Sequence, residues 1–199
     1  MKLKYIAPTL LMVLVLVISL SPVSGQGYGT FIGTARPMRF GSGASGQTVV
    51  YMSSTPTTWG YFVSYTLRGL TLDQLTVLAT DYYVQTPHGI GAGSPRFSIV
   101  MSDGKQVHVY IGDYPNFMYG PTGTWLWSGN LVTDGVLRWD TSQLPGGTFY
   151  DTYSNAVALA NAQGLTIDCI YLGVDSGWWH DQTILFSNIQ INNVIRFPA

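Results

Sequence analysis

Two pairs of tryptophans carry the clearest chemical signal in this sequence. Trp125 and Trp127 alternate along a β-prone run, so both indoles point to one face of a strand. The second pair is adjacent in a predicted loop and is followed by a histidine and an aspartate. Flat rings beside a few polar groups suit the apolar faces and hydroxyls of sugars, although rings can equally fill a sandwich core. The predicted ligand-binding residues are therefore Trp125, Trp127, Trp178, Trp179, His180 and Asp181.

Oxygen-bearing side chains near the C-terminal strand give a second candidate site. Hard cations bind several oxygen ligands, and the edges of jelly rolls often gather them. The spacing is not that of an EF-hand, and ordinary loop polarity explains the same residues. The candidate ligands for a structural Ca²⁺ are Asp175, Asp181, Asn188 and Asn192.

Catalytic motifs are mostly missing. All ten acidic residues are Asp, whereas glycosidases most often use a Glu in their carboxylate pair. Asp140-Thr-Ser and Asp175-Ser-Gly resemble aspartic-protease loops but lie in dissimilar surroundings, which favours turns. The histidines lack metal-ligand spacing, and there is no Gly-x-Ser-x-Gly elbow. We therefore predict no catalytic residue and expect a non-enzymatic role.

Composition excludes several classes of protein. Hydrophobic residues make up 46% of the 199 residues, enough for a packed core. Only 10% are charged and the net charge is −1, so no basic patch is present to neutralise the phosphates of a nucleic acid.

Arg96 is one of few basic residues, and we expect it to pair with an aspartate such as Asp81 or Asp175.

The N-terminus has the pattern of a signal peptide. Lys2 and Lys4 precede an apolar run of about 15 residues, shorter than the roughly 20 that span a bilayer. Small residues follow and place the cleavage after Gly25. We predict a signal peptide over residues 1–25 and a secreted, extracellular or cell-surface protein without a membrane span in its mature chain.

The pattern of the remaining sequence predicts a single all-β domain. We expect a jelly-roll β-sandwich of two antiparallel sheets over residues 46–199. Turn residues separate short β-prone runs, and Asp151–Gln163 predicts one surface helix that Gly164 caps. A change of alternation near Ser187 predicts a β-bulge. The candidate strands are Thr30–Ala35, Gln47–Met52, Gly60–Leu67, Leu75–Val84, Arg96–Met101, Gln106–Ile111, Thr124–Leu131, Val136–Trp139, Thr166–Val174 and Gln182–Ile191.

The glycine-rich segment 26–45 precedes this domain. Its residues 27–34 are β-prone and are predicted to act as a donor strand that adds to the open sheet edge of a second copy. Self-association through residues 26–36 would build an extracellular filament or a biofilm matrix.

Seven stretches between Gly69 and Asn192 match a family of secreted proteins, and they are Leu70–Leu75, Asp81–Tyr83, Gly93–Ile99, Gly123–Trp127, Gly146–Tyr153, Val174–Trp178 and Gln182–Asn192. With these stretches the chain resembles a largely uncharacterised family of jelly-roll domains, lectin-like or similar to carbohydrate-binding modules, in bacteria and archaea. The resemblance implies a sandwich that attaches to surfaces or polymers. This sequence departs from the family at Ser187-Asn188, where the family usually carries Asp-Asn, and the departure weakens a calcium ligand there.

Three functions remain open from the sequence. The first is a non-catalytic module that binds carbohydrate or a cell-surface polymer through exposed aromatic rings. The second is a structural subunit assembled by strand donation, and the third is a polysaccharide-acting hydrolase whose carboxylate pair is not identified.

Overall fold

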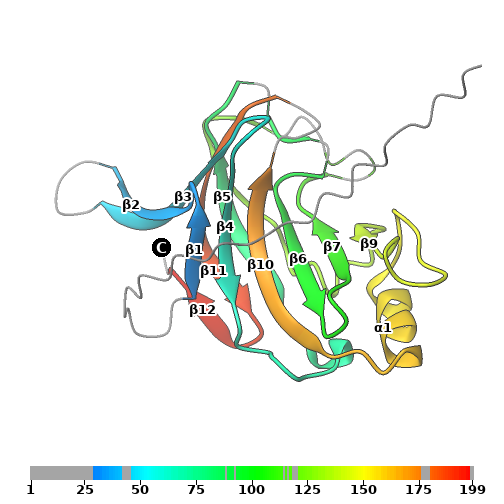
Figure 1. The fold of residues 1–199 in the computed structure, drawn as a ribbon. Helices are drawn as coiled ribbons and strands as arrows, with labels where there is room; N and C mark the ends of the chain where they lie inside the picture. Colours follow the sequence, from blue (N-terminus) through cyan, green and yellow to red (C-terminus); the bar gives the residue numbers. More distant parts are fainter. Residues whose placement is uncertain are drawn as a thin grey trace, which may run out of the picture.

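The computed structural model describes residues 29–41, 46–87, 89–91, 93–113, 115, 117, 121–175 and 180–197. Two antiparallel sheets face each other across an apolar core, with one short helix at the side of the sandwich (Figure 1). The predicted all-β sandwich is therefore confirmed. The predicted signal peptide lies outside the described residues.

Each sheet contains six strands. Sheet A runs, in spatial order, through β1 (Thr30–Gly33), β4 (Trp59–Ser64), β10 (Ile167–Asp175), β6 (Arg96–Met101), β7 (Gln106–Tyr110) and β9 (Trp139–Asp140). Sheet B runs through β2 (Arg36–Phe40), β3 (Gln47–Ser54), β11 (Gln182–Ile191), β5 (Leu78–Val84) and β8 (Trp125–Trp127), and β12 (Val194–Arg196) also pairs with β11.

The order of the strands is that of a jelly roll. The consecutive strands β3, β4, β5 and β6 lie alternately in sheet B and sheet A. Later in the chain, β10 lies between β4 and β6 in sheet A, and β11 lies between β3 and β5 in sheet B. The resulting groups β3-β11-β5-β8 and β4-β10-β6-β7 form nested Greek keys. This connectivity places residues distant in sequence side by side on each outer face.

Strand alternation decides which side chains enter the core. On β7, Val107 and Val109 are fully buried, and His108 between them points to the outer face. On β11, the register against β5 shifts between Ser187 and Gln190, and Asn188 adopts a φ of 50°. The predicted bulge is confirmed. Because it adds a residue to the strand after Ser187, the side chain of Ile189 points into the core.

The predicted helix is present as α1 (Tyr153–Ala162). The Thr152 side chain accepts a hydrogen bond from the Asn155 backbone N–H at 3.2 Å and so caps its first turn. Gly164 follows the helix with a φ of 64°, the left-handed conformation that ends many helices. The Tyr153 hydroxyl donates to the carbonyl oxygen of Leu72, in a 3₁₀ turn over Leu72–Gln74, which fastens α1 to the sandwich.

The N-terminal segment differs from the prediction of one strand over Thr30–Ala35. Its described part forms two short edge strands, β1 on sheet A and β2 on sheet B, and the chain crosses between the sheets at Thr34 and Ala35. The Thr34 hydroxyl donates to the Ser53 carbonyl at 2.5 Å and accepts from the Ser53 N–H at 3.0 Å. These bonds fix the crossing point against β3.

Candidate functional site

The predicted tryptophans Trp125 and Trp127 lie on the outer face of sheet B, on its edge strand β8. Trp125 pairs with Tyr83 of β5, and Leu126 between the two tryptophans packs toward the core. The ring of Trp125 lies 5.6 Å from Tyr83 and 5.7 Å from Phe40, and Phe40 lies 5.1 Å from Tyr83, measured between centroids. We call Phe40, Tyr83 and Trp125 the ring cluster.

Two aliphatic residues share the outer face of sheet B with the ring cluster. Val49 and Leu185 are both fully buried, and Leu185 pairs in register with Tyr83. Neither belongs to the main core between the sheets. The three rings contact one another, which restricts their positions.

Trp127 continues this face to the edge of the sheet and is 50% exposed. It pairs with Asp81 of β5, so its indole lies beside that carboxylate on one face. Burial raises the pKa of Asp81, and a hydrogen bond with the Asn188 side chain opposes this shift. An exposed indole next to a carboxylate that accepts hydrogen bonds is suited to a polyhydroxylated ligand.

Of the second group of predicted binding residues, Trp178 and Trp179 fall outside the described residues, and His180 and Asp181 are exposed just before β11. Leu185 of β11 pairs with Tyr83 of β5, which in turn pairs with Trp125 of β8. The backbone of Asp181 therefore lies two strands across and four residues along from Trp125, roughly 16 Å away. The structure does not join Asp181 to the tryptophans of β8.

The four predicted calcium ligands are not brought together. Asp181 and Asn192 flank opposite ends of the ten-residue strand β11, roughly 30 Å apart. Asp175 pairs with Arg96, and Asn192 Oδ1 accepts from the Thr76 N–H at 2.8 Å. Within the described parts of the chain, no group of three or more His, Cys, Asp or Glu side chains is placed to hold a metal ion.

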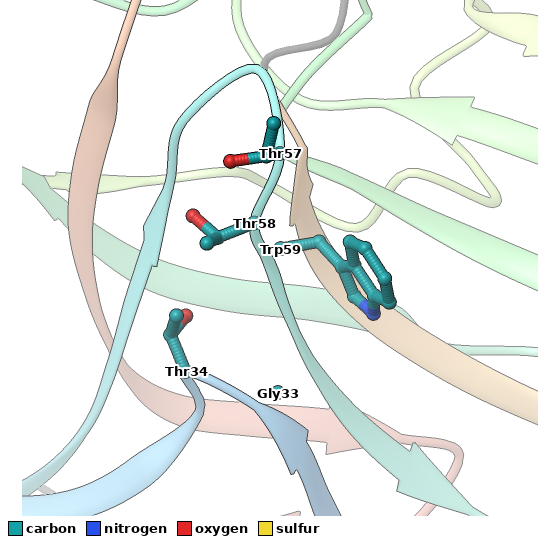
Figure 2. Close-up of a pocket in the computed structure, with 5 residues that line it drawn as sticks. All are labelled: Gly33, Thr34, Thr57, Thr58 and Trp59. Atoms are coloured by element: carbon teal, nitrogen blue, oxygen red, sulfur yellow. The ribbon is translucent and has the colours of Figure 1, made fainter. Parts of the chain in front are cut away.

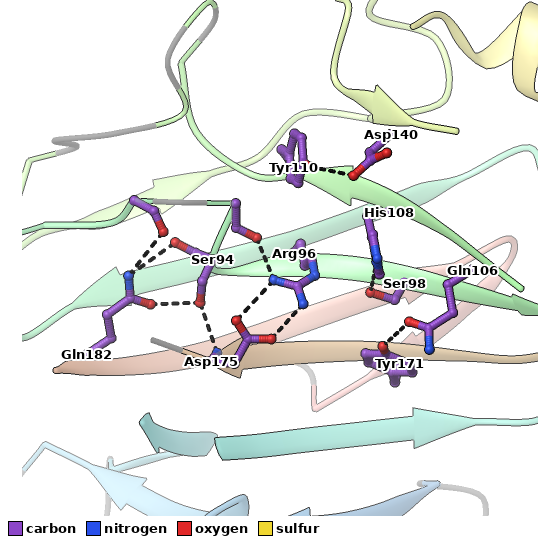
Figure 3. A network of polar contacts seen from close by, with 12 residues as sticks. Ser94, Arg96, Ser98, Gln106, His108, Tyr110, Asp140, Tyr171, Asp175 and Gln182 are labelled. Atoms are coloured by element: carbon purple, nitrogen blue, oxygen red, sulfur yellow. Dashed lines mark hydrogen bonds and ion pairs between the residues drawn. The ribbon is translucent and has the colours of Figure 1, made fainter. Parts of the chain in front are cut away.

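The outer face of sheet A carries a polar network instead (Figure 3). Arg96 Nη2 lies 2.5 Å from Asp175 Oδ2, and Nη1 donates to Asp175 Oδ1 at 3.2 Å. Arg96 also donates to the Gly93 carbonyl at 2.9 Å. The expected pairing of Arg96 is confirmed with Asp175, one of the two predicted partners.

Two aromatic rings lie beside this ion pair. Tyr61 and Tyr171 meet edge to face with centroids 4.9 Å apart, over Gly173 of β10. A Cβ atom at Gly173 would lie 2.3 Å from the Tyr61 ring, so only glycine allows this approach. Burial and the nearby Asp175 carboxylate raise the pKa of Tyr61, which keeps its hydroxyl protonated.

A serine and a histidine are in contact on the same face. Ser98 Oγ and His108 Nδ1 lie 2.7 Å apart, and burial together with Arg96 lowers the pKa of His108 to about 4. Ser98 is fully buried, so an acyl substrate has no access to its hydroxyl. The other ring nitrogen faces Gln143 at 3.5 Å instead of the carboxylate of a triad. We assign the pair a structural role.

The carboxylates of this face are also too far apart for a glycosidase pair. Asp140 on β9 accepts from the Tyr110 hydroxyl at 2.7 Å, while Asp175 lies on β10. Strands β6 and β7 separate them, and the register offsets them by four residues along the strands, so their backbones lie roughly 19 Å apart. Their short side chains cannot bring the carboxyl groups within the roughly 5–9.5 Å of catalytic pairs. These two aspartates do not supply the pair that a hydrolase would need.

Two shallow grooves lie on the described part of the chain. A shallow groove of about 220 Å³ lies beside Trp59 (Figure 2), and another of about 230 Å³ lies at the start of α1. Both are below the roughly 300–1,000 Å³ of pockets for drug-sized ligands. The groove beside Trp59 is lined by Gly33, Thr34, Thr57, Thr58 and Trp59.

Sequence reasoning missed several of these ring positions. Trp59, Tyr61 and Tyr83 lie at alternate positions of strands, and that alternation was the available signal. The sequence predicted no strand over β2, so it gave no alternation from which the side of Phe40 could be predicted. Its place in the ring cluster depends on pairing with β3.

The described residues include no helix long and apolar enough to cross a membrane. No family model, curated protein or solved structure matches this chain.

Proposed function

We propose that this protein is a non-catalytic, extracellular module that binds carbohydrate or a cell-surface polymer through the outer face of sheet B. The observation that carries the proposal is the half-exposed indole of Trp127, continuous with the fixed ring cluster and beside Asp81. A sugar ring would stack on the indole while its hydroxyls donate to the carboxylate.

The packing of the face supports a binding role over simple core filling. Trp125, Tyr83 and Phe40 hold one another in place, so little side-chain entropy is lost when a ligand binds. Trp127 has no such enclosure and offers its surface to solvent. A rigid base with one accessible ring is the arrangement expected of a binding platform.

The test is binding of polysaccharides to the Trp127→Ala variant. We expect its Kd to rise about tenfold or more in pull-down and calorimetric measurements, because a central aromatic anchor supplies much of the binding energy. The matched control is Phe149→Ala, which removes an exposed ring from the loop between β9 and α1. Unchanged binding by Trp127→Ala would refute the proposed face. The Trp178→Ala and Trp179→Ala variants test the predicted loop site separately.

Assembly by strand donation is the second candidate, and β1 favours it. Among the residues that the structure describes, this strand pairs with β4 and lies at the edge of sheet A. Its Phe31 ring lies 5.7 Å from Phe62 and 5.6 Å from Phe197, so one ring of the edge strand contacts the core. The same contacts would form if β1 came from a second copy.

Electron microscopy of the secreted protein tests this alternative. Deletion of residues 26–36 should abolish polymers, and circular dichroism should show whether the sandwich stays folded. The milder variant Phe31→Ala keeps the backbone pairing and should weaken polymers if the ring anchors the donated strand. Polymers that persist in both variants exclude strand donation.

A further inference from the structure

The outer face of sheet A presents a second exposed indole. Trp59 is 42% exposed and pairs in register with Asp175 of β10. Its side chain and the carboxylate therefore lie on one face, as directly paired residues do. This repeats, on the opposite sheet, the juxtaposition of Trp127 with Asp81.

The polar groups beside Trp59 are held in place. The Asp175 carboxylate receives two hydrogen bonds from Arg96, and the side chains of the pair are 16% and 21% exposed. Arg96 is fixed in turn by the Gly93 carbonyl. Both charged groups thus reach solvent in a fixed geometry and offer donors and acceptors without reorganisation.

The charges of this face indicate the class of ligand. The Arg96 guanidinium is neutralised by Asp175, and the lowered pKa of His108 leaves its ring uncharged at pH 7. Asp140 adds a negative charge, with the Tyr110 hydroxyl as its partner. An anionic ligand would meet no unpaired cation among these groups, so a neutral polyhydroxylated ligand fits best.

We propose that the outer face of sheet A is a second saccharide site, centred on Trp59, Asp175 and Arg96. The inference rests on the proposed function of sheet B. Because the two faces lie on opposite sides of the sandwich, one molecule binds two neutral polysaccharide chains and bridges them. Such bridging would turn a binding module into a cross-linker of a polymer matrix.

The experiment measures both binding and cross-linking. Soluble dextran, mannan and xyloglucan serve as neutral probes, alginate serves as the acidic one, and cross-linking is read as turbidity. For a neutral polymer that wild type binds, we expect turbidity with the wild type and at least tenfold less with Trp59→Ala or Trp127→Ala. Each variant should still bind in calorimetry, with about half the sites per protein. The conservative Trp59→Phe keeps a ring and should restore part of the turbidity.

The outcomes separate this inference from the proposed function. Turbidity and stoichiometry unchanged by Trp59→Ala, but lost with Trp127→Ala, would overturn the second site and leave the first. Binding to alginate alone would overturn the neutral saccharide site on sheet A and leave carbohydrate binding by sheet B. Binding to none of the four polymers would overturn both. An equal mixture of the two variants should stay clear, since each molecule has one site. Turbidity in the mixture would show that copies associate, and would overturn bridging by single molecules.

Discussion

The two outer faces of the sandwich hold their aromatic rings by different means. On sheet B, Phe40, Tyr83 and Trp125 pack against one another, and the buried Leu185 pairs in register with Tyr83. On sheet A, Tyr61 and Tyr171 lie within a network of hydrogen bonds anchored by an ion pair. The first face is stabilised by burial, and the second requires every polar partner to be present. The two faces should therefore respond differently to mutation and to pH.

Breaking the ion pair of sheet A should have the largest effect on stability. Arg96→Met leaves the partly buried Asp175 carboxylate without its cation, and we expect a loss of about 2–4 kcal/mol in the free energy of unfolding. Urea denaturation measures it. The double variant Arg96→Met/Asp175→Leu should recover most of the loss, because no uncompensated charge remains.

A matched control for this prediction exists on sheet B. Arg36 lies over the Tyr51 ring at 4.0 Å and is exposed, so Arg36→Met should cost no more than about 1 kcal/mol. Equal losses for Arg36→Met and Arg96→Met would contradict the contrast between the faces.

The pH dependence of stability should also come from sheet A. The folded-state pKa of His108 is about 4, below its ordinary value of 6.5, so the unfolded chain binds the proton more tightly. Stability should fall as pH decreases from about 6.5 to 4, by up to roughly 3 kcal/mol. His108→Asn keeps a polar atom near Ser98 and should flatten this part of the profile, measured by urea denaturation at several pH values. An unchanged slope would show that other groups govern it.

The smallest effect on stability is expected at the centre of the proposed binding face. Trp127 is half exposed, so Trp127→Ala should change the free energy of unfolding by less than about 1 kcal/mol. Thermal unfolding checks this value. A larger loss would mean that Trp127 supports the fold, and its effect on binding could not then be assigned to the ligand. Trp125→Ala is the comparison, because it removes a packed ring and should cost more.

Much of the local structure could be predicted from the sequence. The strands Arg96–Met101 and Gln182–Ile191 have the predicted bounds, because alternation and turn residues are visible over a few positions. The bulge after Ser187 was visible as a change of period. The run Thr124–Leu131 shortened to the three residues of β8 that pair in register with β5. Ser128 and Leu131 also donate to β5 carbonyls, but outside that regular pairing.

The candidate sites were less predictable because they depend on pairing between distant segments. Trp125 and Trp127 could be placed on one face of a strand, but Phe40 joins the ring cluster only through the fold. The four oxygen ligands predicted near the C-terminus are close in sequence, yet the extended strand β11 separates Asp181 from Asn192. Proximity along a β chain is not proximity in space.

Composition and alternation were enough to predict the class of fold, the inward and outward sides of its strands, and a surface poor in charge and rich in aromatic rings. Which side chains meet on each outer face depends on how the strands are ordered in space. Arg96 and Asp175 are 79 residues apart and meet because β6 and β10 are neighbours in the jelly roll. Alternation is a local property of the backbone, whereas register is set by hydrogen bonds between strands that the whole fold brings together.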